Sequence, residues 1–235
     1  MKENPPVISI VIVTYNAAST LQACLDTIYR QRYPAIEIVV IDGDSTDGTV
    51  EIIKQNATRL AHWVSEKDAG IYDAMNKGVK DTTGDWVYFL GADDVLFDGF
   101  SDLCAELKDH KLIYYGRVMT LGGPTIPADA YAFAKYGLCH QAMIYPKEVF
   151  NGRQFNTRYK ISADYAFNIG LFNAGEFTFV FKDHLVANFN QTGVSSTSVD
   201  KIFEKDRSGL VLKYFGIKIW LRFLFWRLKN TIRKK

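Results

Sequence analysis

The hydrophobic positions in the first hundred residues follow two periods that alternate along the chain. Runs that are apolar throughout, such as Val7–Val13 and Ile36–Ile41, are typical of strands buried on both faces of a parallel sheet. Between these runs, apolar residues recur at helical spacing, as in Leu21–Ile28. This order predicts a doubly wound α/β sheet with right-handed crossovers. The predicted strands are Val7–Val13, Ile36–Ile41, His62–Ser65 and Asp85–Leu90, and the predicted helices include Gly48–Gln55 and Ile71–Lys80.

The second half of the chain has a less regular pattern. Further strands are predicted at Leu112–Met119 and Gln141–Tyr145, and a helix at Ala163–Asn173. Phe177–Phe181 and His184–Phe189 are predicted to form a hairpin that turns at Lys182–Asp183. The Gly- and Pro-containing stretch Gly122–Ala134 is predicted to be a loop. Because no linker interrupts the pattern before about residue 195, we predict one domain over residues 1–195 and a tail over residues 196–235.

Composition excludes a chain that is mainly disordered, because 48% apolar and 14% aromatic residues can fill a sizeable core. The net charge of +2 conceals an uneven distribution. Residues 1–207 hold all 26 acids and only 20 Lys and Arg, whereas the last 28 residues hold eight bases and no acid. We therefore expect an acidic body with a basic tail, and no nucleic-acid partner.

The cysteines and the first residues indicate where the protein works. Cys24, Cys104 and Cys139 are odd in number and lack metal-ligand spacing, which favours reduced thiols in the cytosol. The opening segment Met1–Asn16 does not have the pattern of a signal peptide. No window holds the ~20 apolar residues that a spanning helix needs. The expected location is therefore cytoplasmic.

Polar residues follow each of the four predicted strands, where the ligands of open α/β sheets bind. Seven acids fall at these strand ends: Asp42, Asp44, Asp47, Glu66, Asp68, Asp93 and Asp94. Carboxylates repel a phosphate directly but bind one through Mg²⁺ or Mn²⁺, so a metal-bridged nucleotide diphosphate is the ligand that fits. The chain lacks Gly-x-Gly-x-x-Gly and Gly-Lys-Ser/Thr patterns, which counts against NAD enzymes and ATPases.

Motifs at these strand ends resemble those of a known family. They read VISIVIVTYN from Val7, IDGDSTDGT from Ile41, and SEKDAGIYDAMNKGVKDTTGDWVYFLGADD from Ser65. The chain resembles the inverting nucleotide-sugar glycosyltransferases of family two, strongly over residues 6–100 and loosely over 110–195. The longest motif is similar to the bacterial branch that builds O-antigen, capsule or exopolysaccharide repeats. The resemblance implies a GT-A fold, which is a Rossmann-like nucleotide-binding sheet with helices on both faces. Its nucleotide-sugar half would span about residues 1–100 and its acceptor half about residues 101–195.

The resemblance also implies roles for individual residues. Thr14 and Asn16 would line the nucleotide pocket, and Asp42 would contact the base. Asp94 would bind the metal on the diphosphate, and Asp93 would approach the ribose or the metal. Asp164 matches the aspartate that family members use as catalytic base. Asp68 is a further candidate for a nucleotide contact.

Other interpretations of these residues stay open. Gly91 stands where many relatives carry an acid, so the roles of Asp93 and Asp94 can be exchanged. The turn after the second strand reads Asp-Gly-Asp, so Asp44 can share the role of Asp42. In purely structural terms, Asp93–Asp94 would be a capped turn, Asp68 would shape the turn before a helix, and Asp164 would cap its own helix. Three more candidates remain: His140–Gln141 for facing the acceptor, and Tyr72 or Tyr145 for stacking on a sugar or base.

The predicted reaction is a single displacement with inversion. Asp164 takes a proton from an acceptor hydroxyl as that oxygen attacks the anomeric carbon, and Mg²⁺ or Mn²⁺ offsets charge on the leaving diphosphate. The expected donor is a nucleotide-diphosphate sugar, with UDP-hexoses the commonest donors in the family. Two alternatives stay open: a nucleotidyltransferase, although the loop Thr14–Ala18 lacks the Gly-rich basic pattern of those enzymes, and an inactive membrane-associated scaffold of the same fold.

The tail from Ser208 to Lys235 is predicted to form an amphipathic helix. One stripe carries Lys218, Arg222, Lys229 and Arg233, the opposite side carries Ile217, Leu221, Leu224 and Leu228, and Trp220, Phe223, Phe225 and Trp226 lie between. An aromatic, basic helix without acids is typical of a membrane interface, and the alternative is a helix that packs on the catalytic domain. We expect a peripheral protein on the inner face of the cell membrane, with a polyprenyl-diphosphate-linked saccharide as acceptor.

Overall fold

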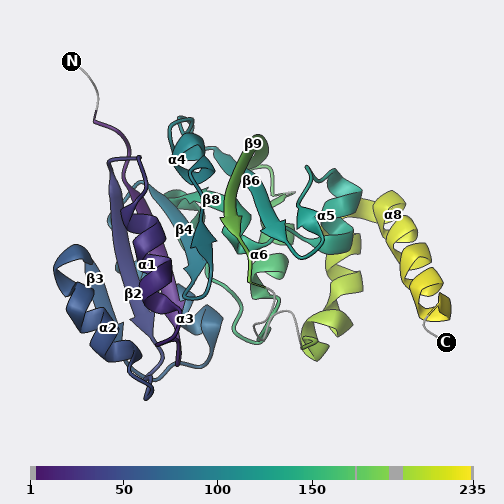
Figure 1. Cartoon of the computed structure of the whole chain (residues 1–235). Helices are drawn as coiled ribbons and strands as arrows, with labels where there is room; N and C mark the ends of the chain where they lie inside the picture. The colour runs from purple at the N-terminus through teal and green to yellow at the C-terminus, as the bar shows by residue number, and fades with distance from the viewer. Residues whose placement is uncertain (1–3, 173, 191–197, 234–235) are drawn as a thin grey trace.

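The computed structural model describes residues 4–172, 174–190 and 198–233. Within these ranges one mixed sheet runs through the molecule in the order β3-β2-β1-β4-β8-β6-β9-β5, with β7 paired to β6 at the side (Figure 1). The strands are β1 (Ile8–Thr14), β2 (Ile36–Asp42), β3 (His62–Ser65), β4 (Trp86–Gly91), β5 (Val95–Leu96), β6 (Leu112–Thr120), β7 (Gly123–Pro124), β8 (Met143–Pro146) and β9 (Thr178–Asn188). The helices are α1 (Leu21–Tyr29), α2 (Thr49–Asn56), α3 (Ile71–Lys80), α4 (Gly99–Cys104), α5 (Ala130–Tyr136), α6 (Ala163–Phe172) and α8 (Lys201–Arg233).

The first part of the sheet is parallel. β1 pairs with β2 and β4, and β2 pairs with β3, all in parallel. Every residue of β1 is buried, as its unbroken apolar pattern predicts. α3 packs so closely on this sheet that a Cβ on Gly78 would lie 2.4 Å from Cγ1 of Val11. The predicted strands of this part, and the predicted helices over α2 and α3, differ from the structure by no more than one residue at either end.

The second part of the sheet is mixed. β8 runs antiparallel to both β4 and β6, and β9 runs parallel to β6. Aromatic rings connect the two parts, because Phe89 of β4 packs edge-on against Tyr145 of β8 and against Phe155, with ring centroids 6.2 and 5.3 Å away. Residues of both parts therefore belong to one continuous hydrophobic core.

The predicted hairpin over residues 177–189 is wrong, because β9 is a single strand. Its pairing with β6 shifts at two points, and the extra residues of β9 form an irregularity at Lys182–Asp183 instead of a turn. Asp183 forms an ion pair with Arg117 of β6. Partners from a distant strand thus outweigh the local turn preference of a polar dipeptide.

Two other predictions for this half are corrected. Gly122–Ala134, predicted as a loop, contains β7 and the start of α5. Asp129 caps α5 by accepting a hydrogen bond from Ala132 N at 2.7 Å. The strand predicted at Gln141–Tyr145 starts two residues too early, since His140–Ala142 form the 3₁₀ turn η2 and β8 begins at Met143. The short helix α4 is absent from the sequence-based prediction.

α8 consists of two helices that meet at Gly216 and fold back on each other. Gly216 has φ 75° and ψ 173°, a combination that is essentially restricted to glycine. Trp220 Nε1 donates to Ser208 Oγ at 3.0 Å, and Arg227 lies 3.3 Å from Glu204, contacts that a straight helix does not allow. The single helix predicted for the tail is therefore corrected to a helical hairpin.

The α8 hairpin packs on α5 and α6, at the end of the molecule opposite β3 (Figure 1). Its inner face buries Phe203 and Phe223. The guanidinium of Arg207 lies between rings, 5.2 Å from that of Phe223 and 5.0 Å from that of Tyr165 in α6. The inner face of the hairpin therefore packs on the rest of the protein, which is the alternative to a helix at a membrane interface. Within the described residues, no helix has both the length and the apolar character needed to cross a membrane.

Candidate active site

A cavity of about 640 Å³ opens where β1 and β4 end, and both halves of the chain line it. The predicted site residues in its lining are Thr14, Asn16, Asp93, Asp94 and Asp164. The first four come from the parallel half and Asp164 comes from the mixed half. His140, Gln141 and Tyr72 also line it, whereas Asp42 and Asp68 do not.

The loops after β1 and β2 fix each other at one side of the cavity. Asn16 adopts a left-handed conformation with φ 49°. Its backbone N donates to Ser45 Oγ at 2.8 Å, and its side-chain oxygen accepts from Thr46 N at 2.9 Å. Thr14 is buried at the end of β1. Both residues predicted for the nucleotide pocket therefore lie in the cavity wall, where their contacts to a nucleotide stay a prediction.

Asp42 and Asp68 have structural partners outside the lining. Asp42 is fully buried and accepts hydrogen bonds from Ser45 N at 2.9 Å and Ser65 Oγ at 2.6 Å. Asp68 accepts from Gly70 N at 2.7 Å in the turn before α3, as its structural interpretation predicts. A nucleotide contact of either residue stays a prediction, and Asp42 would have to exchange its serine partners to make one.

Asp93 and Asp94 follow β4 but differ in exposure. Asp94 is only 2% exposed, and its oxygens accept from Gln141 Nε2 at 2.9 Å and from Asn190 N at 3.0 Å. Asp93 is exposed. Burial raises the pKa of the Asp94 carboxyl above its usual value, and its hydrogen bonds oppose that shift. A Cβ on Gly91 would lie 2.8 Å from Asp94 Oδ2, so a larger residue at this position would require the Asp94 carboxylate to shift.

Asp93 and Asp94 form a donor set that fits a divalent cation. Mg²⁺ and Mn²⁺ take one or two carboxylates and complete their coordination with water and phosphate oxygens. A buried carboxyl with a raised pKa gains from a positive charge nearby. In the part of the chain that the structure describes, no group of three or more His, Cys, Asp or Glu side chains could hold a metal. Phosphate oxygens and water would therefore have to supply the remaining ligands.

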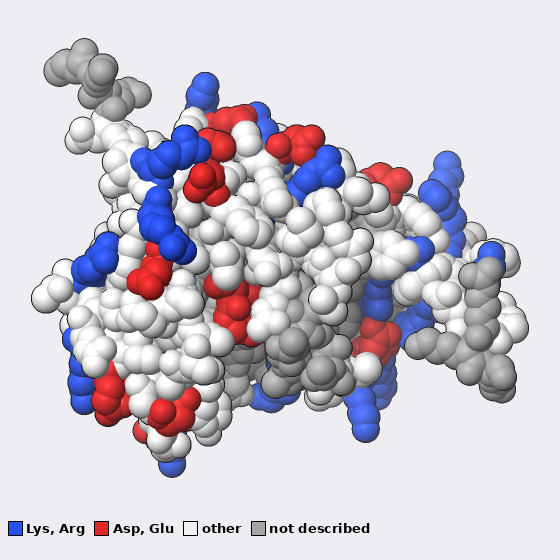
Figure 2. Space-filling model, viewed as in Figure 1, with Lys and Arg blue, Asp and Glu red and all other residues white. Residues whose placement is uncertain are grey.

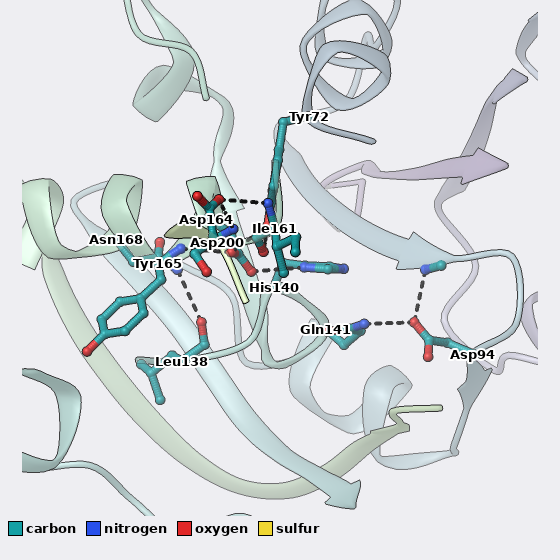
Figure 3. A network of polar contacts seen from close by, with 12 residues as sticks. Tyr72, Asp94, Leu138, His140, Gln141, Ile161, Asp164, Tyr165, Asn168 and Asp200 are labelled. Carbon is teal, nitrogen blue, oxygen red and sulfur yellow. Dashed lines mark hydrogen bonds and ion pairs between the residues drawn. The ribbon is translucent and has the colours of Figure 1, made fainter. Parts of the chain in front are cut away.

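Asp164 lies in the first turn of α6, and other elements hold its carboxylate (Figure 3). The hydroxyl of Tyr72 in α3 donates to Oδ1 at 2.7 Å, and His140 Nδ1 in η2 lies 3.1 Å from Oδ2. The backbone N of Tyr165 also donates to Oδ1, at 2.8 Å. Since α6 begins at Ala163, Asp164 lies inside the helix, and the interpretation of Asp164 as its N-cap is wrong.

Three cavity residues have contacts that the sequence pattern does not reveal. Tyr72, a candidate for stacking, is buried and uses its hydroxyl. Burial raises its pKa well above the usual value and the charge of Asp164 adds to this, so Tyr72 stays protonated and acts as a donor. Gln141 and Asn190 both donate to Asp94. Asn190 is 96 positions from Asp94, so no local motif indicates that contact.

The structure thus joins a parallel nucleotide-type sheet to a mixed half, as in a GT-A type fold, and carboxylates from both halves line one cavity. The chain belongs to glycosyl transferase family 2, whose family model matches residues 9–179. The "PGL/p-HBAD biosynthesis glycosyltransferase" of Mycobacterium tuberculosis is 38% identical over 234 residues, covering 92% of this chain and 91% of the relative. The uncharacterized glycosyltransferase YibD of Escherichia coli is 35% identical over 92 residues, which are 38% of this chain and 27% of that protein.

Solved structures have the same fold. S. aureus TarS 1–349 in complex with UDP-GlcNAc matches with a TM-score of 0.75 at 18% identity, over 93% of this chain and 71% of that chain. The mannosyltransferase PcManGT from Pyrobaculum calidifontis in complex with GDP-Man and Mn²⁺ matches with a TM-score of 0.64 at 21% identity, over 91% and 64%. These matches confirm the predicted GT-A fold, and the family match confirms the predicted enzyme class, a glycosyltransferase. The O-antigen, capsule or exopolysaccharide branch is not indicated by the relatives named here and stays a prediction.

Proposed function

We propose that this protein transfers one hexose from a nucleotide-diphosphate sugar, with a UDP-hexose as the first donor to test, to a hydroxyl of a lipid-linked saccharide. The anomeric configuration inverts, and the product belongs to surface polysaccharide synthesis. The observation that carries the proposal is the placement of Asp93, Asp94 and Asp164 around one cavity. Structures of the same fold contain UDP-GlcNAc and GDP-Man, which supports a nucleotide sugar as the donor.

Asp164 is the base in the proposed mechanism. As the acceptor oxygen attacks the anomeric carbon, its O–H bond breaks and the proton passes to Asp164, while the bond from that carbon to the diphosphate oxygen breaks. Oδ1 of Asp164 already accepts two hydrogen bonds, from Tyr72 and from Tyr165 N. Oδ2 contacts His140 alone among the described residues. Oδ2 therefore has the lone pair that takes the proton.

The opposite wall binds the donor in this mechanism. Asp93 and Asp94 would hold Mg²⁺ or Mn²⁺, which offsets the charge on the leaving diphosphate. Asp93 is the exposed member of the pair and faces the ligand, while Asp94 fixes the turn through Gln141 and Asn190. Thr14 and Asn16 lie where the nucleotide would enter, and Asp42 and Asp68 are proposed to contact it after local rearrangement.

The outer face of the α8 hairpin supports association with an anionic membrane surface. Five apolar side chains form one stripe along the helix after Gly216 and are each 55–70% exposed: Ile217, Leu221, Phe225, Leu228 and Ile232. Lys218, Arg222 and Lys229 lie beside this stripe, and several separate Lys and Arg side chains lie at the α8 end of the molecule at the right of Figure 2. Anionic lipid attracts each such base by about 1 kcal/mol near the surface. We therefore place the protein on the inner face of the cell membrane, with a polyprenyl-diphosphate-linked saccharide as acceptor.

A panel of donors tests the proposed reaction. The protein is incubated with UDP-, GDP- and dTDP-hexoses, Mn²⁺ and a polyprenyl-diphosphate-linked saccharide, and nucleotide diphosphate release and product stereochemistry are measured. We expect one donor to be consumed, with inversion and with transfer to the lipid-linked acceptor. Pyrophosphate release from a nucleoside triphosphate would indicate a nucleotidyltransferase instead. Failure to bind any nucleotide diphosphate with Mn²⁺ would indicate the inactive scaffold.

Substitution of the apolar stripe tests the membrane surface without disturbing the inner face of the hairpin. We expect the triple variant Leu221→Gln, Phe225→Gln, Leu228→Gln to be released from vesicles that contain anionic lipid, as measured by flotation. Ile126→Gln, which changes a 73% exposed side chain outside α8, is the matched control and should leave binding unchanged. Equal binding of the triple variant and the wild type at low salt would contradict the proposal.

A further inference from the structure

The hydroxyl of Tyr72 has one proton and two acceptors. Its oxygen lies 2.7 Å from Asp164 Oδ1 and 2.6 Å from the backbone oxygen of Ile161 (Figure 3). Both distances are those of strong hydrogen bonds, but a tyrosine hydroxyl donates only once. The side chain of Tyr72 is buried, so these two oxygens compete for its proton.

The second acceptor is fixed in place from α8. Asp200 is buried at the start of that helix, and its Oδ2 accepts from Ile161 N at 3.0 Å and Ser162 N at 3.3 Å. Its Oδ1 accepts from Phe203 N at 3.0 Å in the first turn of α8. The carbonyl of Ile161 is therefore held beside Tyr72 whatever the charge on Asp164.

The charge on Asp164 decides which acceptor is the stronger one. A hydrogen bond to an ionised carboxylate is roughly twice as strong as one to a neutral carbonyl, so ionised Asp164 draws the Tyr72 proton toward Oδ1. After Oδ2 has taken the proton of the acceptor hydroxyl, Oδ1 is a neutral carbonyl oxygen and the Ile161 carbonyl competes with it on equal terms. No proton leaves Tyr72 in either state, because burial keeps its pKa well above the usual value.

We propose that Tyr72 is a positioning residue that orients the Asp164 carboxylate before the reaction and shares its hydroxyl proton with Ile161 afterwards. The inference rests on the proposed function, in which Asp164 is the base. The other titratable groups around this carboxylate and the cavity wall beside it are His140, Cys139, Tyr145, Lys160, Asp200 and Arg207. Wild type and Tyr72→Phe share all of them, so the comparison isolates the Tyr72 hydroxyl.

The test is the split between kcat and KM in Tyr72→Phe. The variant keeps the ring, whose centroid lies 5.6 Å from that of Phe155, and removes one donor to the carboxylate. Because that donor orients the carboxylate, its loss should lower kcat by about tenfold, while KM for the donor changes less than about twofold. Tyr159→Phe is the matched control, since its hydroxyl donates to Asp206 instead, and it should leave kcat unchanged.

A second measurement does not depend on turnover. The carbon NMR signal of the Asp164 carboxyl in the resting protein should lie at a different chemical shift in Tyr72→Phe than in the wild type, because the variant lacks one hydrogen bond to that carboxylate. Coincident carboxyl signals, or an unchanged kcat in Tyr72→Phe, would overturn the inference. If the wild type transfers sugar from no donor, the proposed function fails, and the NMR comparison still decides whether Tyr72 controls Asp164.

Discussion

The two halves of the molecule hold their functional carboxylates in different ways. Asp93 and Asp94 stand directly after β4 in the parallel half, and a local hydrogen bond from Gly91 N to Asp94 Oδ2, at 3.0 Å, closes their turn. Asp164 in the mixed half is held by Tyr72 and His140, which are 92 and 24 positions away along the chain. The parallel half thus builds its side of the cavity from strand order and a local turn. The mixed half builds its side only after long-range packing.

Loss of the base is expected to have the largest effect. In Asp164→Ala we expect kcat to fall about a hundredfold or more while the protein stays folded and binds its donor, because the donor side of the cavity is built by the other half. Nucleotide release measures kcat, calorimetry measures donor binding, and Tm measures whether the protein stays folded. Asp206→Ala, which removes a carboxylate outside the cavity lining, is the control and should keep its activity. Near-full activity in Asp164→Ala would remove it as the base.

The two acids of the parallel half should fail in distinct ways. Asp93→Ala and Asp94→Ala should each lower transfer by about a hundredfold, since both act on the leaving diphosphate through the metal. Asp93 is exposed, so its loss should weaken Mn²⁺-dependent donor binding with little change in Tm. Asp94→Ala also leaves Gln141 and Asn190 without their acceptor and should lower Tm as well. Equal Tm values for the two variants would contradict the expectation that only Asp94 stabilises the fold.

A matched pair of helical glycines compares packing in the two halves. In α3 of the parallel half, Gly78→Ala places a Cβ 2.4 Å from Val11 Cγ1 and 3.1 Å from Ile41 Cγ1, which should cost about 1–3 kcal/mol of unfolding free energy. In α6 of the mixed half, Gly170→Ala meets its nearest atoms, those of Tyr214, at 3.9 Å. Its better helix propensity should add about 0.5–1 kcal/mol. Urea unfolding measures the free energy of unfolding of both variants. If this free energy changes in the same direction in both, the expected difference in packing between the two halves is contradicted.

A smaller effect is expected at Glu37, which ties the amino ends of β1 and β2 to the turn before β4. Partial burial raises the pKa of Glu37, but hydrogen bonds from Ser9, Thr83 and Gly84 outweigh it and hold the pKa below its usual value. A lowered pKa in the folded state stabilises the protein above the ordinary carboxyl range, and that stability is lost as the pH falls through the lowered value. Glu37→Gln should therefore cost about 1 kcal/mol at neutral pH, a value kept small by partial exposure. When urea unfolding is measured in acid, the difference in unfolding free energy between the wild type and Glu37→Gln should shrink. A difference that stays constant with pH would contradict the lowered pKa of Glu37.

The parallel half could be predicted from the sequence because its information is local. An unbroken β-branched run such as Val7–Val13 suits only a buried strand, and the acids after each strand necessarily meet at one edge of a parallel sheet. Thr14, Asn16, Asp93 and Asp94 accordingly line one cavity, and their roles there stay a prediction. Asp42 and Asp68 lie outside its lining, because Ser45 and Ser65 donate to the Asp42 carboxylate and Gly70 N donates to that of Asp68.

The mixed half could be predicted only in part because distant partners determine it. The dipeptide Lys182–Asp183 favours a turn by itself, and only pairing with β6 keeps it within a strand. The family motif points to Asp164, whereas the sequence marks Tyr72 and His140 as candidates for other roles and does not show that they contact this carboxylate. The break at Gly216 is equally hidden, since glycine also occurs within helices and only contacts between the two arms, such as Glu204 with Arg227 and Ser208 with Trp220, show that the chain reverses.

The reversal at Gly216 also sets a mechanical property of the molecule. A straight helix of 33 residues would be about 50 Å long, and a contact at its far end would act through a long lever. A small tilt of such a rod would carry the catalytic domain through a large arc. Folding the helix into two arms shortens the lever to roughly 25 Å and braces the outer arm against the inner one, through Glu204 with Arg227 and Ser208 with Trp220. A given tilt of the outer arm on a surface therefore displaces the cavity about half as far as it would with a straight tail.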